Sequence, residues 1–270
     1  MNIFITLVEQ PLTNALVVIY NGLVSFNVPY ALGFSIIALT AFIRLLLYPL
    51  TASQMKTQKK MQDIAPHLNK LKEKHKGDMK GQQAATMALY KEHGLNPAAG
   101  CLPALLQLPI FFGLYGVLQK AVSVKSIDEV NKLLYSDTLK LKSVWDTDFF
   151  GLPLGKTPGD LFAALGVAIL LVPVVTGLLQ FVQSKMMIAP KDKEQAKKTN
   201  LPAKTNDSKP DFASTFQKQT LYFLPIMIGV FSYGFPLGLS LYWNTFTLFG
   251  IIQQYMVSGW GGLKDGIKLK

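Results

Sequence analysis

The sequence has few of the residues on which disulfides, metal sites and acid–base enzymes depend. Among 270 residues there is one cysteine, Cys101, which excludes a disulfide within the chain and suits a small buried position. The three histidines are His67, His75 and His93, and their spacing fits no compact metal motif. We therefore expect no metal site and no cofactor.

Charged residues are also scarce. They make up 16% of the chain, whereas half of the residues are apolar, and the mean hydropathy is positive, at +0.27. This balance is typical of an integral membrane protein.

Four apolar stretches reach the length of a membrane-spanning helix, about 20 residues. The last one divides at the turn Pro236-Leu237-Gly238, so we predict an all-α membrane protein with five spans. The predicted spans are Ala31–Leu50, Ala99–Ala121, Leu161–Gln183, Lys218–Phe235 and Leu237–Ser258.

The segment before the first span, residues 1–30, is amphipathic. Its apolar residues recur at helical spacing, at Leu12, Leu16, Ile19, Leu23 and Phe26. This pattern predicts a helix that lies in the membrane interface. Because the first eight residues carry no basic group, we do not expect a signal peptide.

Lysines in the connections predict the orientation, because positive charge near span ends stays in the cytoplasm. Residues 51–98 hold nine lysines against four acids, and residues 184–217 hold seven against four. Residues 122–160, by contrast, hold five lysines against six acids, and the tail 259–270 holds three against one. The N-terminus is therefore predicted outside and the C-terminus in the cytoplasm, with 122–160 as an outer loop.

The first basic connection, residues 51–98, has a helical pattern of its own. Apolar positions from Ile64 to Leu71 and from Met87 to Tyr90 flank the turn at Gly77-Asp78, and Pro66 is expected to bend the first arm. We predict a cytoplasmic helical hairpin. Its flexible apolar side chains suit either helix packing or the binding of varied apolar partners, and they are Met55, Met61, Met79 and Met87.

Acidic residues and histidines are absent from the predicted spans, apart from residues at span boundaries. A proton relay or a metal site inside the membrane would therefore have no ligands. Ser240 has no histidine or lysine base close in sequence, as a serine protease would need. We predict that the protein is not an enzyme.

The only arginine, Arg44, lies inside the first predicted span. An arginine at mid-membrane costs roughly 2.5–3.5 kcal/mol and persists with a partner or a water-filled cavity. Arg44 could instead extend to the nearer interface, because it lies six residues before Leu50. No acid in the spans can neutralise it, which favours a wet, positively charged concavity among the helices.

Uncharged polar residues on the spans are the other candidates for this concavity. Thr40 lies one turn before Arg44, and Gln107 stands among apolar neighbours on the second span. One face of the last span carries Ser240, Trp243, Asn244 and Thr247. Hydrogen bonding between helices explains each polar residue equally well, but it does not explain a guanidinium.

Three ordered motifs are similar to a known family. They are Phe42–Leu50 (FIRLLLYPL), Asn96-Pro97 followed by Gly100–Tyr115 (GCLPALLQLPIFFGLY), and Pro236–Asn244 (PLGLSLYWN). With the lysine-rich hairpin between the first two, this order resembles the YidC/Oxa/Alb membrane-protein insertases, from about Pro11 to Tyr255.

The resemblance implies five spans around a hydrophilic groove that opens to the cytoplasm and to lipid. Arg44 matches the groove arginine, Gln107 the polar residue of the second span, and Trp243 the aromatic residue of the last. The hairpin would contact the substrate first. The protein would then move short outer segments of nascent membrane proteins through the groove and release their spans into lipid.

The resemblance also implies a location and partners. The location is the bacterial inner membrane, and the partners are nascent membrane proteins and the lipid bilayer, with the ribosome and the Sec translocon as further candidates and no DNA. The short tail, residues 259–270, differs from long basic ribosome-binding extensions. Two other functions stay open: an assembly chaperone without insertase activity, and a small-solute transporter, although no inverted repeat is evident.

Overall fold

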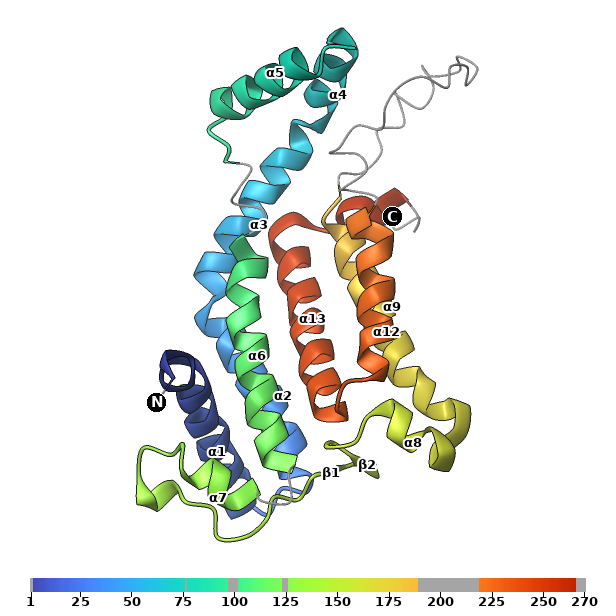
Figure 1. Cartoon of the computed structure of the whole chain (residues 1–270). Helices are drawn as coiled ribbons and strands as arrows, with labels where there is room; N and C mark the ends of the chain where they lie inside the picture. Colours follow the sequence, from blue (N-terminus) through green and yellow to red (C-terminus); the bar gives the residue numbers. More distant parts are fainter. Residues whose placement is uncertain (1, 76, 97–101, 123–125, 189–218, 266–270) are drawn as a thin grey trace. The chain divides into compact units, whose positions relative to one another are not determined.

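The computed structural model describes residues 2–75, 77–96, 102–122, 126–188 and 219–265 (Figure 1). Nearly all of the regular structure is helical, so the all-α prediction is confirmed. Cys101 and most of the second basic connection, 184–217, lie outside the described residues, as do 266–270 of the tail.

The first half of the chain contains η1 (Ile5–Glu9), α1 (Gln10–Ser25), α2 (Ala31–Leu46), α3 (Tyr48–Asp63), α4 (Ala65–Lys74) and α5 (Met79–Glu92). The middle contains α6 (Leu102–Val122), α7 (Ser126–Asn131), η3 (Asp137–Leu139), β1 (Asp148–Phe149), β2 (Leu152–Pro153), α8 (Pro158–Leu165), η4 (Gly166–Leu170) and α9 (Leu171–Met186). The last part contains η5 (Gln219–Phe223), α12 (Leu224–Tyr233), α13 (Leu237–Ser258) and η6 (Gly261–Asp265).

These elements belong to two compact units. Unit 1 comprises Met1–Tyr48, Ala104–Leu179 and Ile226–Phe249. Unit 2 comprises Pro49–Pro103, Gln180–Pro225 and Gly250–Lys270.

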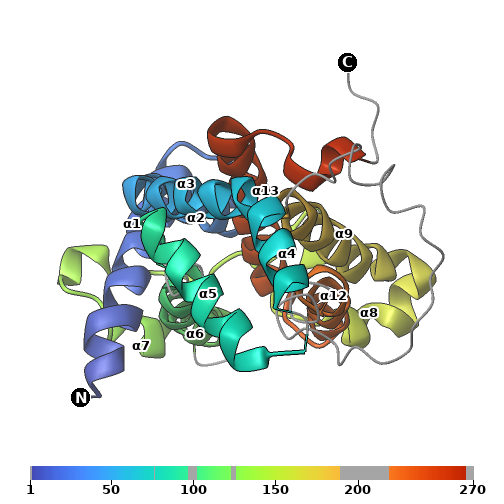
Figure 2. The ribbon, with the colours of Figure 1, turned by 90° about the horizontal axis from the view of Figure 1, so that it is seen from above.

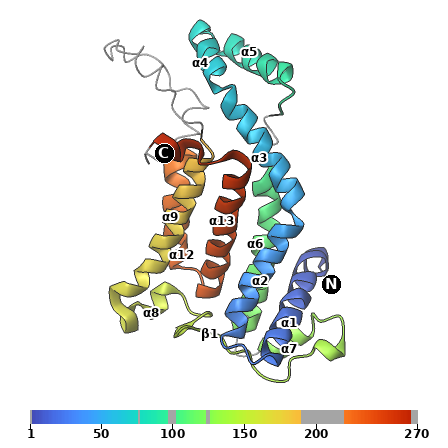
Figure 3. The ribbon, with the colours of Figure 1, turned by 180° about the vertical axis from the view of Figure 1, so that it is seen from behind.

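Unit 1 is built around an apolar core shared by α1, α2, α6 and the first half of α13. Leu16, Ile36, Val117 and Leu239 are almost completely buried within it. Helix α1 packs along α2 (Figure 3). Residues with large apolar side chains therefore fill the space between helices at helical spacing, as a packed bundle requires.

A short antiparallel pair of strands, β1 and β2, lies in the connection between α7 and α8. Its Phe149 ring packs on α2 at Gly33, where an added Cβ would lie 2.0 Å from the ring. The missing side chain of Gly33 is therefore what allows the ring to lie against the helix.

The helix in the first predicted span stops before the predicted end. Helix α2 ends at Leu46, Leu47 forms a turn, and α3 begins at Tyr48. Pro49 explains the break, because its ring lacks an N–H and would collide with the carbonyl four residues earlier in a continuous helix. Pro66 likewise lies just after a break, at Ile64.

The third predicted span, Leu161–Gln183, includes parts of three helical segments that follow one another without a gap. Thr157 and Asp160 form a capping box that starts α8 at Pro158, and the 3-10 stretch η4 separates α8 from α9. By length and composition, Pro158–Met186 is the one described stretch that could cross a membrane as a single helix, and α2 with α3 could form a second, bent span. Leu221–Tyr233 is a shorter apolar helix.

Unit 2 holds the predicted hairpin region. Helices α4 and α5 contact each other (Figure 2). The carboxylate of Asp78 caps α5 by accepting a hydrogen bond from the Gly81 backbone nitrogen at 3.0 Å. Beyond α5, Leu95 is buried.

Candidate functional site

Arg44 lies in the last turn of α2, and its side chain is covered by Phe246 of α13. Only 4% of Arg44 is exposed. Its guanidinium carbon is 3.4 Å from the centre of the Phe246 ring. One of its terminal nitrogens donates a hydrogen bond of 2.6 Å to the Phe246 carbonyl oxygen. The single residue Phe246 thus provides both a π-face and an acceptor for a buried cation.

Thr40, one turn before Arg44, is also buried. Its hydroxyl donates to the Ile36 carbonyl at 2.6 Å, within the same helix. This contact satisfies the hydroxyl within its own helix. The sequence prediction placed Thr40 and Arg44 on one face, and both are buried in unit 1.

Gln107 of α6 reaches the last helix through Tyr242. Its amide nitrogen donates to the Tyr242 hydroxyl at 2.5 Å, and Tyr242 is 1% exposed. The Tyr242 ring lies 5.9 Å from the Phe246 ring, one turn further along α13. Gln107, Tyr242, Phe246 and Arg44 therefore form a continuous set of contacts among α6, α13 and α2.

The residues of the polar face predicted on α13 have different contacts. Ser240 is buried and meets the Ser232 hydroxyl of α12 at 3.1 Å. Trp243 packs edge-on against Phe111 of α6, with 5.3 Å between the ring centres. Thr247 is 1% exposed. Ser240 and Trp243 are therefore parts of helix–helix interfaces, and Thr247 is buried beside them on the same helix.

Asn244 differs from its neighbours. Its side-chain oxygen is buried and has no hydrogen-bond partner among the described residues. A buried amide oxygen without a partner is unfavourable by about 1–3 kcal/mol. Such a group is therefore available to a donor that enters the site.

The serine pair extends to a third helix. The Ser232 hydroxyl donates to the Thr176 hydroxyl of α9 at 3.3 Å. Nearby, Gly229 of α12 and Gly177 of α9 approach so closely that an added Cβ on Gly229 would lie 3.4 Å from the Gly177 Cα. Small residues and hydroxyls thus hold α9, α12 and α13 together in unit 1, as is common between membrane helices.

An ion pair in unit 1 was not predicted. The Lys120 ammonium of α6 pairs with the Glu9 carboxylate at the end of η1. Their side chains are 27% and 12% exposed, respectively. Gly116 makes room for the carboxylate, because an added Cβ there would lie 2.6 Å from a Glu9 oxygen. The sequence does contain Glu9, but nothing in its spacing links it to Lys120.

Phe246 and Tyr242 were also missed by the sequence reasoning. Tyr242 lies within the family-like motif Pro236–Asn244, but it reads as one apolar position among several. Phe246 lies 202 positions from Arg44. No local pattern connects residues at that separation.

The predicted substrate-contact methionines lie in unit 2 and have different exposures. Met79 and Met87 of α5 are 71% and 44% exposed. Met55 and Met61 of α3 are partly buried. The two methionines of α5 therefore present flexible apolar surface, whereas those of α3 are partly used in packing.

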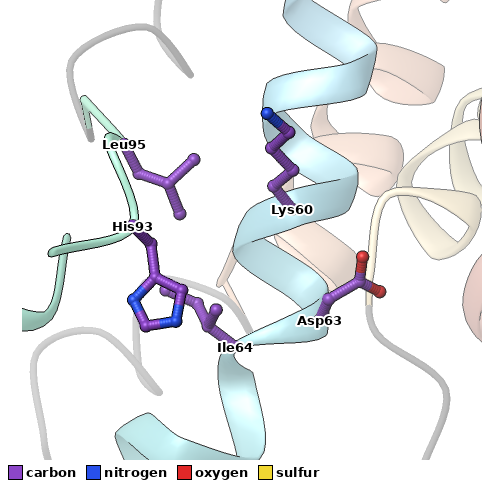
Figure 4. Close-up of a pocket in the computed structure, with 5 residues that line it drawn as sticks. All are labelled: Lys60, Asp63, Ile64, His93 and Leu95. Carbon is purple, nitrogen blue, oxygen red and sulfur yellow. The ribbon is translucent and has the colours of Figure 1, made fainter.

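Unit 2 also contains a cavity of about 290 Å³. It is lined by Lys60, Asp63, Ile64, His93 and Leu95, between the end of α3 and the segment after α5 (Figure 4). None of the four methionines lines it. Within the described part of the chain, no three His, Cys, Asp or Glu side chains gather as metal ligands would.

Comparison with known proteins places these features in a family context. The family described as 60Kd inner membrane protein matches residues 24–261. The membrane protein insertase YidC of Fusobacterium nucleatum is 34% identical over 225 residues, which are 83% of this chain and 85% of that protein. The membrane protein insertase MisCA of Bacillus subtilis is 34% identical over 231 residues, which are 84% of this chain and 70% of that protein.

Some relatives are much longer. The membrane protein insertase YidC of Wolinella succinogenes is 32% identical over 226 residues, or 84% of this chain, but the match covers 33% of that protein. The present chain thus corresponds to about a third of that relative.

Proposed function

The chain belongs to the 60Kd inner membrane protein family, and we propose that it is a membrane-integrated insertase for newly made membrane proteins. The match over residues 24–261 carries this proposal. The relatives from F. nucleatum and B. subtilis are named as membrane protein insertases. The proposed activity requires no covalent chemistry, so we propose that the protein is not an enzyme.

The proposed arrangement has five spans and a hydrophilic groove in unit 1 that opens to the cytoplasm and to lipid. Residues Arg44, Thr40, Gln107 and the α13 face from Ser240 to Thr247 would line it. Exposed apolar side chains on α9 and α12 support lipid contact: Leu171 is 65% exposed, Ile226 66% and Val230 65%. Large apolar side chains exposed in this way are favourable in a bilayer and unfavourable in water.

In the proposed mechanism, Arg44 attracts the short and often acidic outer segment of a nascent protein. A guanidinium remains charged at every accessible pH, and its attraction for a carboxylate grows as the surroundings become less polar. The segment would move from water into a groove that reaches about halfway through the membrane. This would shorten the distance that the segment must travel through the apolar part of the bilayer. Asn244, with its unpartnered oxygen, could accept a backbone N–H of that segment.

The apolar part of the substrate supplies the driving force. A span of about 20 residues gains about 25 cal/mol for every Å² of apolar surface transferred from water to lipid. This gain is available without nucleotide hydrolysis. The insertase would therefore lower the barrier for the polar outer segment, while partitioning of the span makes the process favourable.

The hairpin region of unit 2 would make the first substrate contact, through Met79 and Met87. The lysine distribution supports an N-terminus outside and a C-terminus in the cytoplasm, within the bacterial inner membrane. Nascent membrane proteins and lipid would be the direct partners. The ribosome and the Sec translocon would be further partners.

Reconstitution into liposomes tests the proposal. The substrate is a single-span protein with an acidic outer tail, and insertion is measured as protection of the tail from external protease. Wild type and Arg44→Lys should insert the tail, whereas Arg44→Ala should lose at least ten-fold in rate. Lys156→Ala, which removes an exposed positive charge from unit 1, should behave as wild type. Equal insertion by all variants would contradict the role of Arg44.

The burial of Arg44 favours one second function. A guanidinium that is 4% exposed and already bonded to Phe246 would suit an assembly chaperone whose arginine joins α2 to α13. In that case, the folding of spans that are already inserted would depend on the protein, and liposome insertion would not. The same substrate, pre-inserted and then tested for assembly, separates the two functions.

A further inference from the structure

We propose that Phe246 is the specificity-determining residue of the Arg44 site: its ring covers the guanidinium, and a substrate carboxylate must displace it. This inference deepens the proposed insertase function and rests on it. The structure shows the contact between the Phe246 ring and Arg44. The consequence is a threshold: the outer segment of a substrate must carry enough carboxylates to displace the ring.

The two contacts of Phe246 with Arg44 differ in how easily they can change. The carbonyl oxygen, 2.6 Å from the guanidinium nitrogen, belongs to the middle of α13 and stays where the helix holds it. The ring, whose centre is 3.4 Å from the guanidinium carbon, can turn about the Cα–Cβ bond. Rotation of one side chain would therefore uncover the face of the cation without moving a helix.

The surroundings limit where the ring can go. Tyr242 packs beside it, with 5.9 Å between ring centres. Tyr242 is itself held by Gln107 and is almost completely buried. Tyr242 is therefore a fixed neighbour on one side of the Phe246 ring. It favours the closed position, in which the ring covers the Arg44 guanidinium.

The chemistry of the exchange explains the selectivity. A desolvated cation–π contact is favourable, and a carboxylate can form two parallel, charge-assisted hydrogen bonds with the N–H groups at the edge of a guanidinium. Because Arg44 is 4% exposed, the covering ring has to turn aside before a carboxylate can reach those groups. The new hydrogen bonds of an acidic segment offset the lost ring contact, whereas a neutral segment offers no such compensation. With a small side chain at position 246, this discrimination should weaken, because no ring would have to be displaced.

The single arginine of the chain makes the closed state measurable without any substrate. Phenylglyoxal reacts preferentially with guanidinium groups, and the chain has one arginine, so an adduct located at Arg44 reports on its accessibility. The protein is labelled in detergent, and the rate of adduct formation at Arg44 is followed by peptide mapping with mass spectrometry. Phe246→Ala should react about ten-fold faster than wild type or more, as expected for the loss of a buried cation–π contact. Phe246→Leu, which retains bulk but no π-face, should fall between the two.

Phe235→Ala is the matched control. It removes a ring of the same size from unit 1, where Phe235 packs against Phe111 and Phe231, and it should react at the wild-type rate. Wild-type rates for both Phe246 variants would overturn the proposal. Equal acceleration by Phe246→Ala and Phe235→Ala would also overturn it, because it would indicate general loosening. If Phe246→Ala does not fold, the rate of Phe246→Leu decides in the same way.

Insertion of two substrates, whose outer tails carry one and four carboxylates, then tests the threshold. In wild type the four-carboxylate tail should insert faster, and Phe246→Ala should reduce that ratio at least three-fold. An unchanged ratio would overturn the threshold. Failure of wild type to insert either tail would count against the insertase function, while the labelling result would still decide whether Phe246 covers Arg44.

Discussion

The surroundings of Arg44 in unit 1 and helix α5 in unit 2 differ in which side chains are buried and which are exposed. In unit 1, a cation and several hydroxyls are buried, and some of them bond to another helix, as Arg44 does to Phe246 and Ser232 does to Thr176. On α5, apolar methionines are exposed instead. The conformation of the first region therefore depends on buried contacts, whereas α5 presents an exposed apolar surface to possible partners.

This contrast predicts different tolerances to mutation. A change in unit 1 should alter folding and the insertion site together, because buried partners cannot rearrange without loss. A change on the exposed face of α5 should alter contact with substrates and leave stability almost unchanged.

The largest expected effect is at Gly33. In Gly33→Ala the new methyl would lie 2.0 Å from the Phe149 ring, so the ring must leave α2, at about 3 kcal/mol of stability. The matched change in unit 2 is Gly81→Ala, where the nearest atom is the end of the Asp78 side chain, which can move. Its movement weakens the cap of α5, while alanine favours the helix over glycine, so the net effect should stay within about 1 kcal/mol. Thermal unfolding in detergent measures the stability of both variants. Equal losses of stability would contradict the expected difference between the two units.

A smaller effect is expected for the ion pair between Glu9 and Lys120. Glu9→Gln leaves a partly buried ammonium without its carboxylate and should destabilise unit 1 by about 2 kcal/mol. Adding Lys120→Met should recover most of that loss, because neither charge is then buried. Unfolding in a denaturing-detergent titration gives the two values. If the double variant is less stable than the single variant, the ion pair does not act as described.

The serine bridge between α9, α12 and α13 should contribute less. Ser232→Ala removes one hydroxyl and leaves Ser240 and Thr176 without their shared partner. We expect a loss of about 1 kcal/mol in the free energy of unfolding. Ser143→Ala, at an exposed position of the same unit, provides the comparison and should not differ from wild type.

The smallest effect on stability is expected on α5. Met79→Ser combined with Met87→Ser should change the free energy of unfolding by no more than about 0.5 kcal/mol. Insertion of apolar substrates should nevertheless fall about two- to three-fold, because flexible apolar contacts are lost. Rates from the liposome assay test this expectation. A large loss of stability with unchanged insertion would reverse the assignment of α5 as surface.

Much of the architecture follows from local signals in the sequence. Helix α13 occupies Leu237–Ser258, the range that hydropathy and the Pro236 turn indicated. The all-α class and the family resemblance are confirmed. Both rest on patterns within short windows, where apolar spacing and motif order are directly readable.

The remainder depends on contacts between distant positions. The sequence marks Arg44 as exceptional, but its cover, Phe246, reads as one aromatic residue among many. Glu9 and Lys120 are likewise joined only by the packing of η1 against α6. The predicted first span includes Pro49, but the helix breaks at Leu47. The apolar run continues past the proline, so hydropathy does not show the break that the proline ring causes.

Site-specific photo-crosslinking shows whether the outer segment of a substrate passes beside Arg44. A photoreactive residue is placed at Trp243 of α13 or, as a control, at Tyr135 of unit 1, which is 63% exposed. A substrate held partway through insertion should crosslink its acidic tail to position 243 and not to position 135. If insertion proceeds while position 243 stays unlabelled, the segment takes another route, which contradicts a path beside Arg44.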